Sequence, residues 1–266
     1  MNISVKKSIE SYLEGFLQGL INKYDPKILK DEILKKVSFD ATKGEYKPFH
    51  EALIPPEFLR IQRFFRSFST SLGQGVFEYI ARIVTEANSK WEEVKLNHRF
   101  NAFASPNIQS QIDTFIENIQ QRRIKPYPYP KFAKPNSNDT KEIVVDLSFK
   151  DKKTGTIYFI EIKSPKPNKD QTRRTKEKFL FLLSTYPKCK TYYAFPYNPY
   201  GENKENYNWS FTKMFFDLDT EVLIGEEFWD FIGGKNTYKD ILEIFKTVGK
   251  RKGREITRRL ISSSLL

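Results

Sequence analysis

The sequence predicts an α/β (α+β) fold in which a mixed central β-sheet is flanked by helices. Within residues 143–164, two apolar β-type runs enclose a Lys-Lys-Thr-Gly turn, which is the pattern of a hairpin. Segments with apolar residues at helical spacing precede and follow this hairpin, so helices can pack on a sheet built around it.

With 266 residues the chain is long enough to bury a substantial core. This length allows one large domain or two small ones, and we expect a single domain over residues 1–266. Its parts are a mainly helical region at 1–125, a sheet core at 139–235, and a helix with a basic C-terminal tail at 236–266.

Each element follows from its pattern. An apolar stripe that includes Val5, Ile9 and Leu13 predicts an N-terminal helix, and a second helix is expected after Pro26. The expected elements before the hairpin are then a loop at 38–56, helices at 57–65, 76–89 and 107–122, and a turn with a helix cap at 67–75. The proline-rich segment 125–138 cannot be regular structure.

Beyond the hairpin we expect a helix through residues 176–184, with Asp170 as its N-cap. The remaining expected elements are a strand at 191–196, a polar loop at 198–208, a strand within 215–224, and helices at 226–232 and 238–248.

The net charge of +12 indicates a polyanionic partner, first a nucleic acid and second an anionic membrane. A lysine-rich genome is the alternative explanation. One cysteine and two histidines exclude a disulfide framework within the chain and nearly exclude a zinc enzyme. No apolar run approaches the length of a membrane span, and the N-terminus lacks the features of a signal peptide, so a cytoplasmic protein is expected.

The hairpin also carries the chemistry. Asp146 lies in its first run, and Glu161-Ile162-Lys163 closes the second. Alternate strand residues share a face, so Glu161 and Lys163 point the same way, and Asp146 can lie beside them. Two carboxylates and an ammonium group at one place can hold Mg²⁺ and position a water molecule for phosphodiester hydrolysis. The alternative is an exposed hairpin whose charges are simply solvated.

The pattern Asp146…Glu161-Ile162-Lys163 resembles the PD-(D/E)xK nuclease superfamily, although Val145 stands where the superfamily usually has proline. The blocks at 48–81 and 224–234, taken with the hairpin, are similar to one group of type II restriction endonucleases. This resemblance implies a restriction-endonuclease-like core and a single nuclease domain.

The resemblance also implies an activity. The expected enzyme hydrolyses both strands of duplex DNA at a short palindromic site with Mg²⁺ and leaves 5′-phosphates. Double-stranded DNA is the expected partner, the enzyme is expected to be a homodimer, and a cognate DNA methyltransferase is expected in the same cell. The alternatives are a repair or junction-resolving nuclease of the same fold and a non-catalytic DNA-binding protein.

The expected metal ligands are Asp146, Glu161 and, by resemblance, the carbonyl of Ile162. Lys163 is expected to orient the attacking water and stabilise charge on phosphorus. It could act as a base only if its pKa fell well below about 10.4. Glu78, in the helix VFEYIA, is a further expected site residue by resemblance, and an ordinary exposed glutamate is the alternative.

Asp139 and Asp151 compete with Asp146 for the metal, but neither lies in an apolar strand. Basic and polar residues just after the hairpin are expected to bind DNA, mainly through its phosphates. They are Lys166, Lys169, Gln171, Arg173, Arg174 and Lys176. The basic run 246–259 is either a further DNA contact or a solvated, frayed tail.

Overall fold

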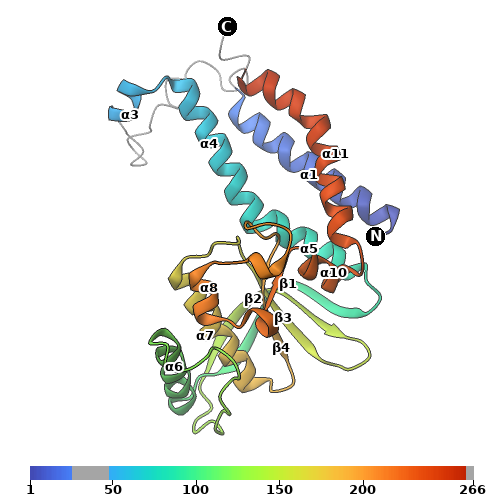
Figure 1. Cartoon of the computed structure of the whole chain (residues 1–266). Coiled ribbons are helices and arrows are strands. Elements are labelled where there is room, and N and C mark those ends of the chain that lie inside the picture. Colours follow the sequence, from blue (N-terminus) through green and yellow to red (C-terminus); the bar gives the residue numbers. More distant parts are fainter. Residues whose placement is uncertain (26–47, 262–266) are drawn as a thin grey trace. The chain divides into compact units, whose positions relative to one another are not determined.

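The computed structural model of the chain describes residues 1–25 and 48–261 (Figure 1). The chain divides into two compact units, one at residues 77–238 and one that combines residues 2–76 with 239–266. The assignment of the whole chain to one nuclease domain remains a prediction. In the described parts of the chain, no helix is both long and apolar enough to span a lipid bilayer.

The first unit is built on a five-stranded mixed sheet whose strands lie side by side in chain order. Its first three strands are antiparallel, and the fourth and fifth run parallel to the third. The strands are β1 (Trp91–Phe103), β2 (Thr140–Asp151), β3 (Ile157–Ile162), β4 (Lys190–Phe195) and β5 (Val222–Ile224). The mixed sheet confirms the predicted fold class.

Helices cover both faces of this sheet. Phe159 of β3 belongs to the main core cluster, which draws on α6, α7 and α8. Its neighbour Tyr158 instead contacts Trp91, Phe149 and Phe231, and Phe231 comes from α10. Adjacent strand residues point to opposite faces, so the two clusters fill the two sides of the sheet. The helices of this unit are α5 (Phe77–Glu86), α6 (Pro106–Gln120), α7 (Lys169–Thr185), α8 (Ser210–Phe215), α9 (Leu218–Glu221), α10 (Glu226–Gly233) and the short 3₁₀ helix Lys204–Asn206.

The second unit is helical. It contains α1 (Ile3–Tyr24), α3 (Pro48–Leu53), α4 (Pro56–Ser71), the π-helical turns Leu72–Val76 and Thr257–Ile261, and α11 (Thr237–Ile256) from residue 239 onward. The side chain of Asn2 accepts a hydrogen bond from the N–H of Val5 and caps α1. The apolar stripe predicted for this helix is buried.

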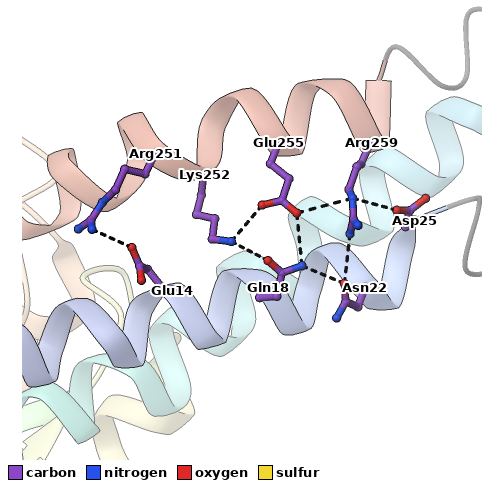
Figure 2. Close-up of polar contacts among 8 residues, drawn as sticks. All are labelled: Glu14, Gln18, Asn22, Asp25, Arg251, Lys252, Glu255 and Arg259. Atoms are coloured by element: carbon purple, nitrogen blue, oxygen red, sulfur yellow. Dashed lines mark hydrogen bonds and ion pairs between the residues drawn. The ribbon is translucent and has the colours of Figure 1, made fainter.

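Ion pairs and hydrogen bonds join α1 to the C-terminal helices of the same unit (Figure 2). Arg251 contacts Glu14 at 3.1 Å, Lys252 contacts Gln18 at 2.6 Å, and the Arg259 side chain lies 3.3 Å from Asp25. The basic run 246–259 is therefore helical, and Arg251, Lys252 and Arg259 have partners in residues 14–25, so the expectation of a frayed tail is wrong for this run.

Several element predictions are confirmed, and others are wrong. The hairpin, the helices that became α4, α5, α6, α10 and α11, the strand β4, and the irregular segment 125–138 are present. The second helix expected after Pro26 lies outside the described residues. The expected loop at 38–56 is wrong for Pro48–Leu53, which is helical.

The expected turn at 67–75 is wrong because the chain stays helical through a π-turn, and Gly75 has no left-handed backbone there. The expected strand at 215–224 is reduced to Val222–Ile224, because α8 and α9 occupy or border the rest. Asn168 caps α7 in place of Asp170, with Gln171 completing a capping box. The long strand β1 was not predicted.

Candidate active site

Asp146, Glu161 and Lys163 meet where β2 and β3 separate. Leu147 and Ile160 are the last paired residues on this side of the hairpin. Beyond that pair, the Asp146 carboxylate accepts a hydrogen bond of 2.9 Å from the N–H of Ile162. The Lys163 ammonium lies 2.8 Å from Asp146 and 2.9 Å from Glu161. The structure thus brings the three predicted motif residues into one cluster.

Both carboxylates are buried, with Asp146 9% and Glu161 4% exposed. Burial, followed by the charge of Glu161, raises the pKa of Asp146, while Lys163 opposes that rise. Burial by itself would lower the pKa of Lys163, but Glu161 and Asp146 outweigh it, and the pKa lies above its ordinary value. Lys163 is therefore held as a cation in this arrangement.

Glu78 of α5 lies near the same cluster. Burial, and then the charge of Asp146, raise the pKa of Glu78 to about 7, while the charge of Lys163 lowers it. These interactions place the predicted Glu78 beside the motif residues and distinguish it from an ordinary exposed helical glutamate.

Lys178 of α7 is a member of the cluster that the sequence reasoning missed. Its ammonium lies 2.6 Å from the second carboxylate oxygen of Glu161. The spacing of Lys178 is the sequence signal that could have found it. Lys178 follows Thr175 by three positions and precedes Leu182 by four, so it lies on the helix face of these two residues, both of which are buried. A lysine on the buried face of a helix has to find an anionic partner.

The competing aspartates have other roles. Asp151 accepts hydrogen bonds of 2.9 Å from the N–H groups of Lys153 and Thr154, which hold the hairpin turn. Asp139 accepts a hydrogen bond from the hydroxyl of Ser137 and is exposed. Neither aspartate forms a hydrogen bond or ion pair with Asp146, Glu161 or Lys163. This geometry agrees with Asp146 as the stronger candidate for the metal.

Most residues expected to bind DNA are accessible. Lys166, Lys169, Gln171 and Arg174 are exposed, and Arg173 is about half-buried. Gln171 uses its side-chain oxygen in the capping box of α7. Lys176 was also expected to bind DNA, and this is wrong. It has no exposed surface because it forms a buried ion pair with Glu221 and donates to the carbonyl of Pro126.

A groove of about 660 Å³ runs along β1 beside α5. Tyr79 and Arg82 line it from α5, and residues 94–99 line it from β1. Its lining includes Arg82, Lys95 and Arg99 and contains no carboxylate. Two of these cations have acidic partners nearby, since Arg82 pairs with Glu86 and Arg99 pairs with Glu142.

The donor set fits a hard divalent cation. In the described residues, no three or more His, Cys, Asp or Glu side chains gather as a metal site. Mg²⁺ needs only one or two carboxylates, because water and phosphate oxygens complete its shell. Asp146 and Glu161 both touch the single ammonium of Lys163, so their oxygens are close enough to share one small ion.

Comparisons with known proteins identify the family of this chain. The family model described as type II restriction endonuclease, HinfI, matches residues 1–249. The type II restriction enzyme HgiCII of Herpetosiphon aurantiacus is 32% identical over 98% of this chain and 99% of its own length. HgiEI of the same organism is 31% identical over the same shares.

MjaII of Methanocaldococcus jannaschii, also a type II restriction enzyme, is 29% identical over 73% of this chain and 56% of its own length. No solved structure matches the chain. A family match over nearly the whole chain confirms the predicted resemblance to type II restriction endonucleases. The chain belongs to the HinfI family of type II restriction endonucleases, which cleave DNA at specific sites.

Proposed function

We propose that this enzyme hydrolyses both strands of duplex DNA at a short palindromic site, uses Mg²⁺, and leaves 5′-phosphates. The observation that carries the proposal is the contact of Lys163 with both Asp146 and Glu161, at the point where the pairing of β2 with β3 stops. This is the side-chain set of a PD-(D/E)xK nuclease.

Asp146 and Glu161 are the proposed metal ligands, joined by the carbonyl of Ile162. When bound, Mg²⁺ would supply a Lewis acid that activates water and neutralises charge on the phosphate. The hydrogen bond from the N–H of Ile162 fixes the Asp146 carboxylate against the strand that carries Glu161. The two acids are thereby oriented before any ligand arrives.

Lys163 is the proposed electrostatic catalyst. Its raised pKa in the metal-free protein keeps the ammonium charged at neutral pH, which favours charge stabilisation over action as a base. Glu78 has a pKa of about 7, so it can accept a proton near neutral pH, and we propose that it accepts the proton of the attacking water. In-line attack on phosphorus then expels the 3′ oxygen, which leaves a 5′-phosphate.

The proposed DNA contacts are Lys166, Lys169, Gln171, Arg173 and Arg174, which follow the active site in the chain. The groove along β1 supports a second path for the phosphate backbone, because its charged side chains are all cationic. The proposed homodimer brings two such sites to the two strands of a palindrome, and a cognate methyltransferase would protect the host DNA.

The decisive experiment is digestion of phage DNA with Mg²⁺ by the wild-type enzyme, Asp146→Asn and Lys163→Met, with Asp139→Asn as a matched carboxylate control. Wild type and Asp139→Asn should give discrete bands, and the two site variants should give none. The fragment ends should be ligatable without a kinase, and sequenced ends should define a palindrome.

Cleavage that survives in Asp146→Asn or Lys163→Met would contradict the proposed site. Fragments that need a kinase before ligation would contradict the proposed 5′-phosphate product. Sequenced ends that share no two-fold symmetric site would contradict the palindrome and the symmetric dimer.

A further inference from the structure

Both carboxylate oxygens of Glu161 carry an ammonium group. Lys163 contacts one oxygen at 2.9 Å, and Lys178 contacts the other at 2.6 Å. The two lysines come from different elements, since Lys163 directly follows β3 and Lys178 lies two helical turns into α7. A metal cation that binds Glu161 must therefore displace at least one of the two ammonium groups, or bind a carboxylate oxygen that an ammonium group also contacts.

The four side chains in direct contact at Glu161 and Asp146 are balanced in charge. Asp146 and Glu161 contribute two negative charges, and Lys163 and Lys178 contribute two positive charges. A divalent cation added to this balanced, buried cluster meets two ammonium groups at short range, where repulsion is poorly screened. Binding of the metal to the DNA-free protein is therefore opposed by the lysines that hold its ligands.

The two lysines differ in how firmly they are held. Lys163 contacts both Asp146 and Glu161. Lys178 contacts Glu161, and both lysine side chains are partly exposed, 24% for Lys178 and 29% for Lys163. A long side chain with one carboxylate contact moves at lower cost than one held by two buried acids. Lys178 is the group that a metal would displace.

We infer that Lys178 is a positioning residue that occupies the Glu161 ligand and keeps divalent cations out of the active site until DNA is bound. The inference rests on the proposed function, because it takes Glu161 as a metal ligand. DNA would relieve the block because a phosphate adds negative charge beside the ammonium groups. The metal would then enter together with its substrate.

The test is a titration of the full-length, DNA-free protein with Mn²⁺ at fixed ionic strength, followed by calorimetry. Lys178→Met should bind Mn²⁺ at least about tenfold more tightly than wild type, because the competing ammonium is gone. Lys178→Arg keeps the charge and should bind as weakly as wild type. Lys188→Met is the matched control, since Lys188 is an exposed lysine just after α7.

A Lys178→Met protein that binds Mn²⁺ no more tightly than wild type would overturn the inference, and so would equal tightening in Lys188→Met. Thermal unfolding of all variants distinguishes a change in Mn²⁺ binding from a loss of the fold. Lys178→Arg is the conservative replacement. If Lys178→Arg tightened binding as much as Lys178→Met, the lysine would act by packing and the charge argument would fail.

The double variant Lys178→Met/Asp146→Asn separates this inference from the proposed function. It should lose the Mn²⁺ affinity that Lys178→Met gains. If the double variant kept that affinity, the metal would bind elsewhere and the proposed ligand set would be wrong. If Asp146→Asn abolished both DNA cleavage and Mn²⁺ binding while Lys178→Met left binding unchanged, only the role of Lys178 would be lost.

Discussion

Glu78 shows how a single carboxyl group is tuned by its surroundings. It lies on α5, and its neighbours are the two carboxylates and one lysine of the motif. Burial and the charge of Asp146 disfavour its ionised form, so its pKa rises from 4.5 to about 7. The folded protein therefore holds a proton on Glu78 at pH values where the unfolded chain would release it.

This difference predicts a pH dependence of stability in metal-free protein. A raised folded-state pKa contributes stability that is fully present below 4.5 and is lost as the pH rises through about 7. Wild type should therefore lose unfolding free energy between pH 5 and pH 8 relative to Glu78→Gln, which has no proton to release. Urea unfolding in EDTA at several pH values measures the difference. A constant gap between the two proteins across this range would contradict the shifted pKa.

Lys163 and Lys178 show that two lysines of one cluster can have separate roles. Lys163 forms ion pairs with both Asp146 and Glu161, whereas Lys178 forms an ion pair with Glu161. A Lys163→Arg variant would keep the positive charge. Its planar guanidinium group cannot take the position of the compact ammonium group.

We predict that Lys163→Arg cleaves DNA at least about 100-fold more slowly than wild type, because a bulkier planar cation misplaces both acids by distances that matter for catalysis. Single-turnover cleavage of phage DNA at saturating enzyme measures the chemical step. Lys188→Arg, an exposed and conservative change just after α7, should alter the single-turnover rate little. Near-wild-type rates in Lys163→Arg would show that charge is sufficient.

At the scale of elements, α7 does two structural tasks on different faces. Lys178 reaches Glu161 at the active site, and Lys176 is fully buried against Glu221. The Lys176 ammonium also lies over the rings of Tyr129 and Phe216, at 4.8 and 5.1 Å from their centroids. The buried pair anchors the helix to α9 and to the segment before β2, which fixes the face that carries Lys178.

We predict that Lys176→Met destabilises the protein by about 3–5 kcal/mol, because it leaves Glu221 buried without a cation. The double variant Lys176→Met/Glu221→Gln should recover much of that loss, since a neutral amide can keep the hydrogen bond from the N–H of Asp217. Urea unfolding measures both. The exposed Lys169→Met should change stability by no more than about 0.5 kcal/mol. A double variant as unstable as the single one would contradict this account.

The helical unit has its own organising element, the seam between α1 and the C-terminal helices (Figure 2). Arg251 reaches both Glu10 and Glu14 of α1, and Glu255 lies between Lys252 and Arg259. Alternating charges along two facing helices fix their register, because a shift by one turn would bring like charges together.

This register can be tested by exchanging charges. Arg251→Glu should lower the thermal midpoint, because it places a third acid beside Glu10 and Glu14. The double variant Glu14→Arg/Arg251→Glu should recover part of the loss by restoring an opposite-charge pair. Thermal unfolding at low and high salt measures both, and the effect should shrink at high salt. No recovery in the double variant would contradict a direct pair.

At the scale of the whole molecule, the net charge of +12 and the family membership agree. A polyanionic substrate explains why so much positive charge remains in a folded chain, since repulsion among the lysines is relieved when DNA binds. The cationic groove along β1 and the exposed residues at the start of α7 both lie in the unit that carries the active site.

We predict that the enzyme is a homodimer, because one active site per chain must serve two antiparallel strands. Light scattering after size exclusion should give twice the chain mass of 31.4 kDa. A complex with one palindromic duplex should contain two chains. A monomer of 31.4 kDa both alone and on DNA would contradict symmetric cleavage by a dimer.

The sequence determined those features that depend on residues near one another in the chain. The hairpin brings Asp146 and Glu161 together across a short turn, and strand alternation places Lys163 beside Glu161, so this part of the site could be predicted from spacing alone. Glu78 was predicted by resemblance only, since no local rule relates α5 to β3. The alternating apolar residues from Val94 to Ala102 did signal β1, but the signal was overlooked.

The tertiary structure decided which residues of α7 serve the active site. The sequence assigned Lys176 to DNA and gave no role to Lys178, and the rotation of the packed helix reversed this. Residues two positions apart on a helix, such as 176 and 178, point in directions that differ by roughly 200° around its axis. The face of the helix that packs on the sheet therefore determines which of the two residues reaches the candidate site. That choice is made by the burial of distant partners such as Glu221 and Phe216, which only the folded chain brings together.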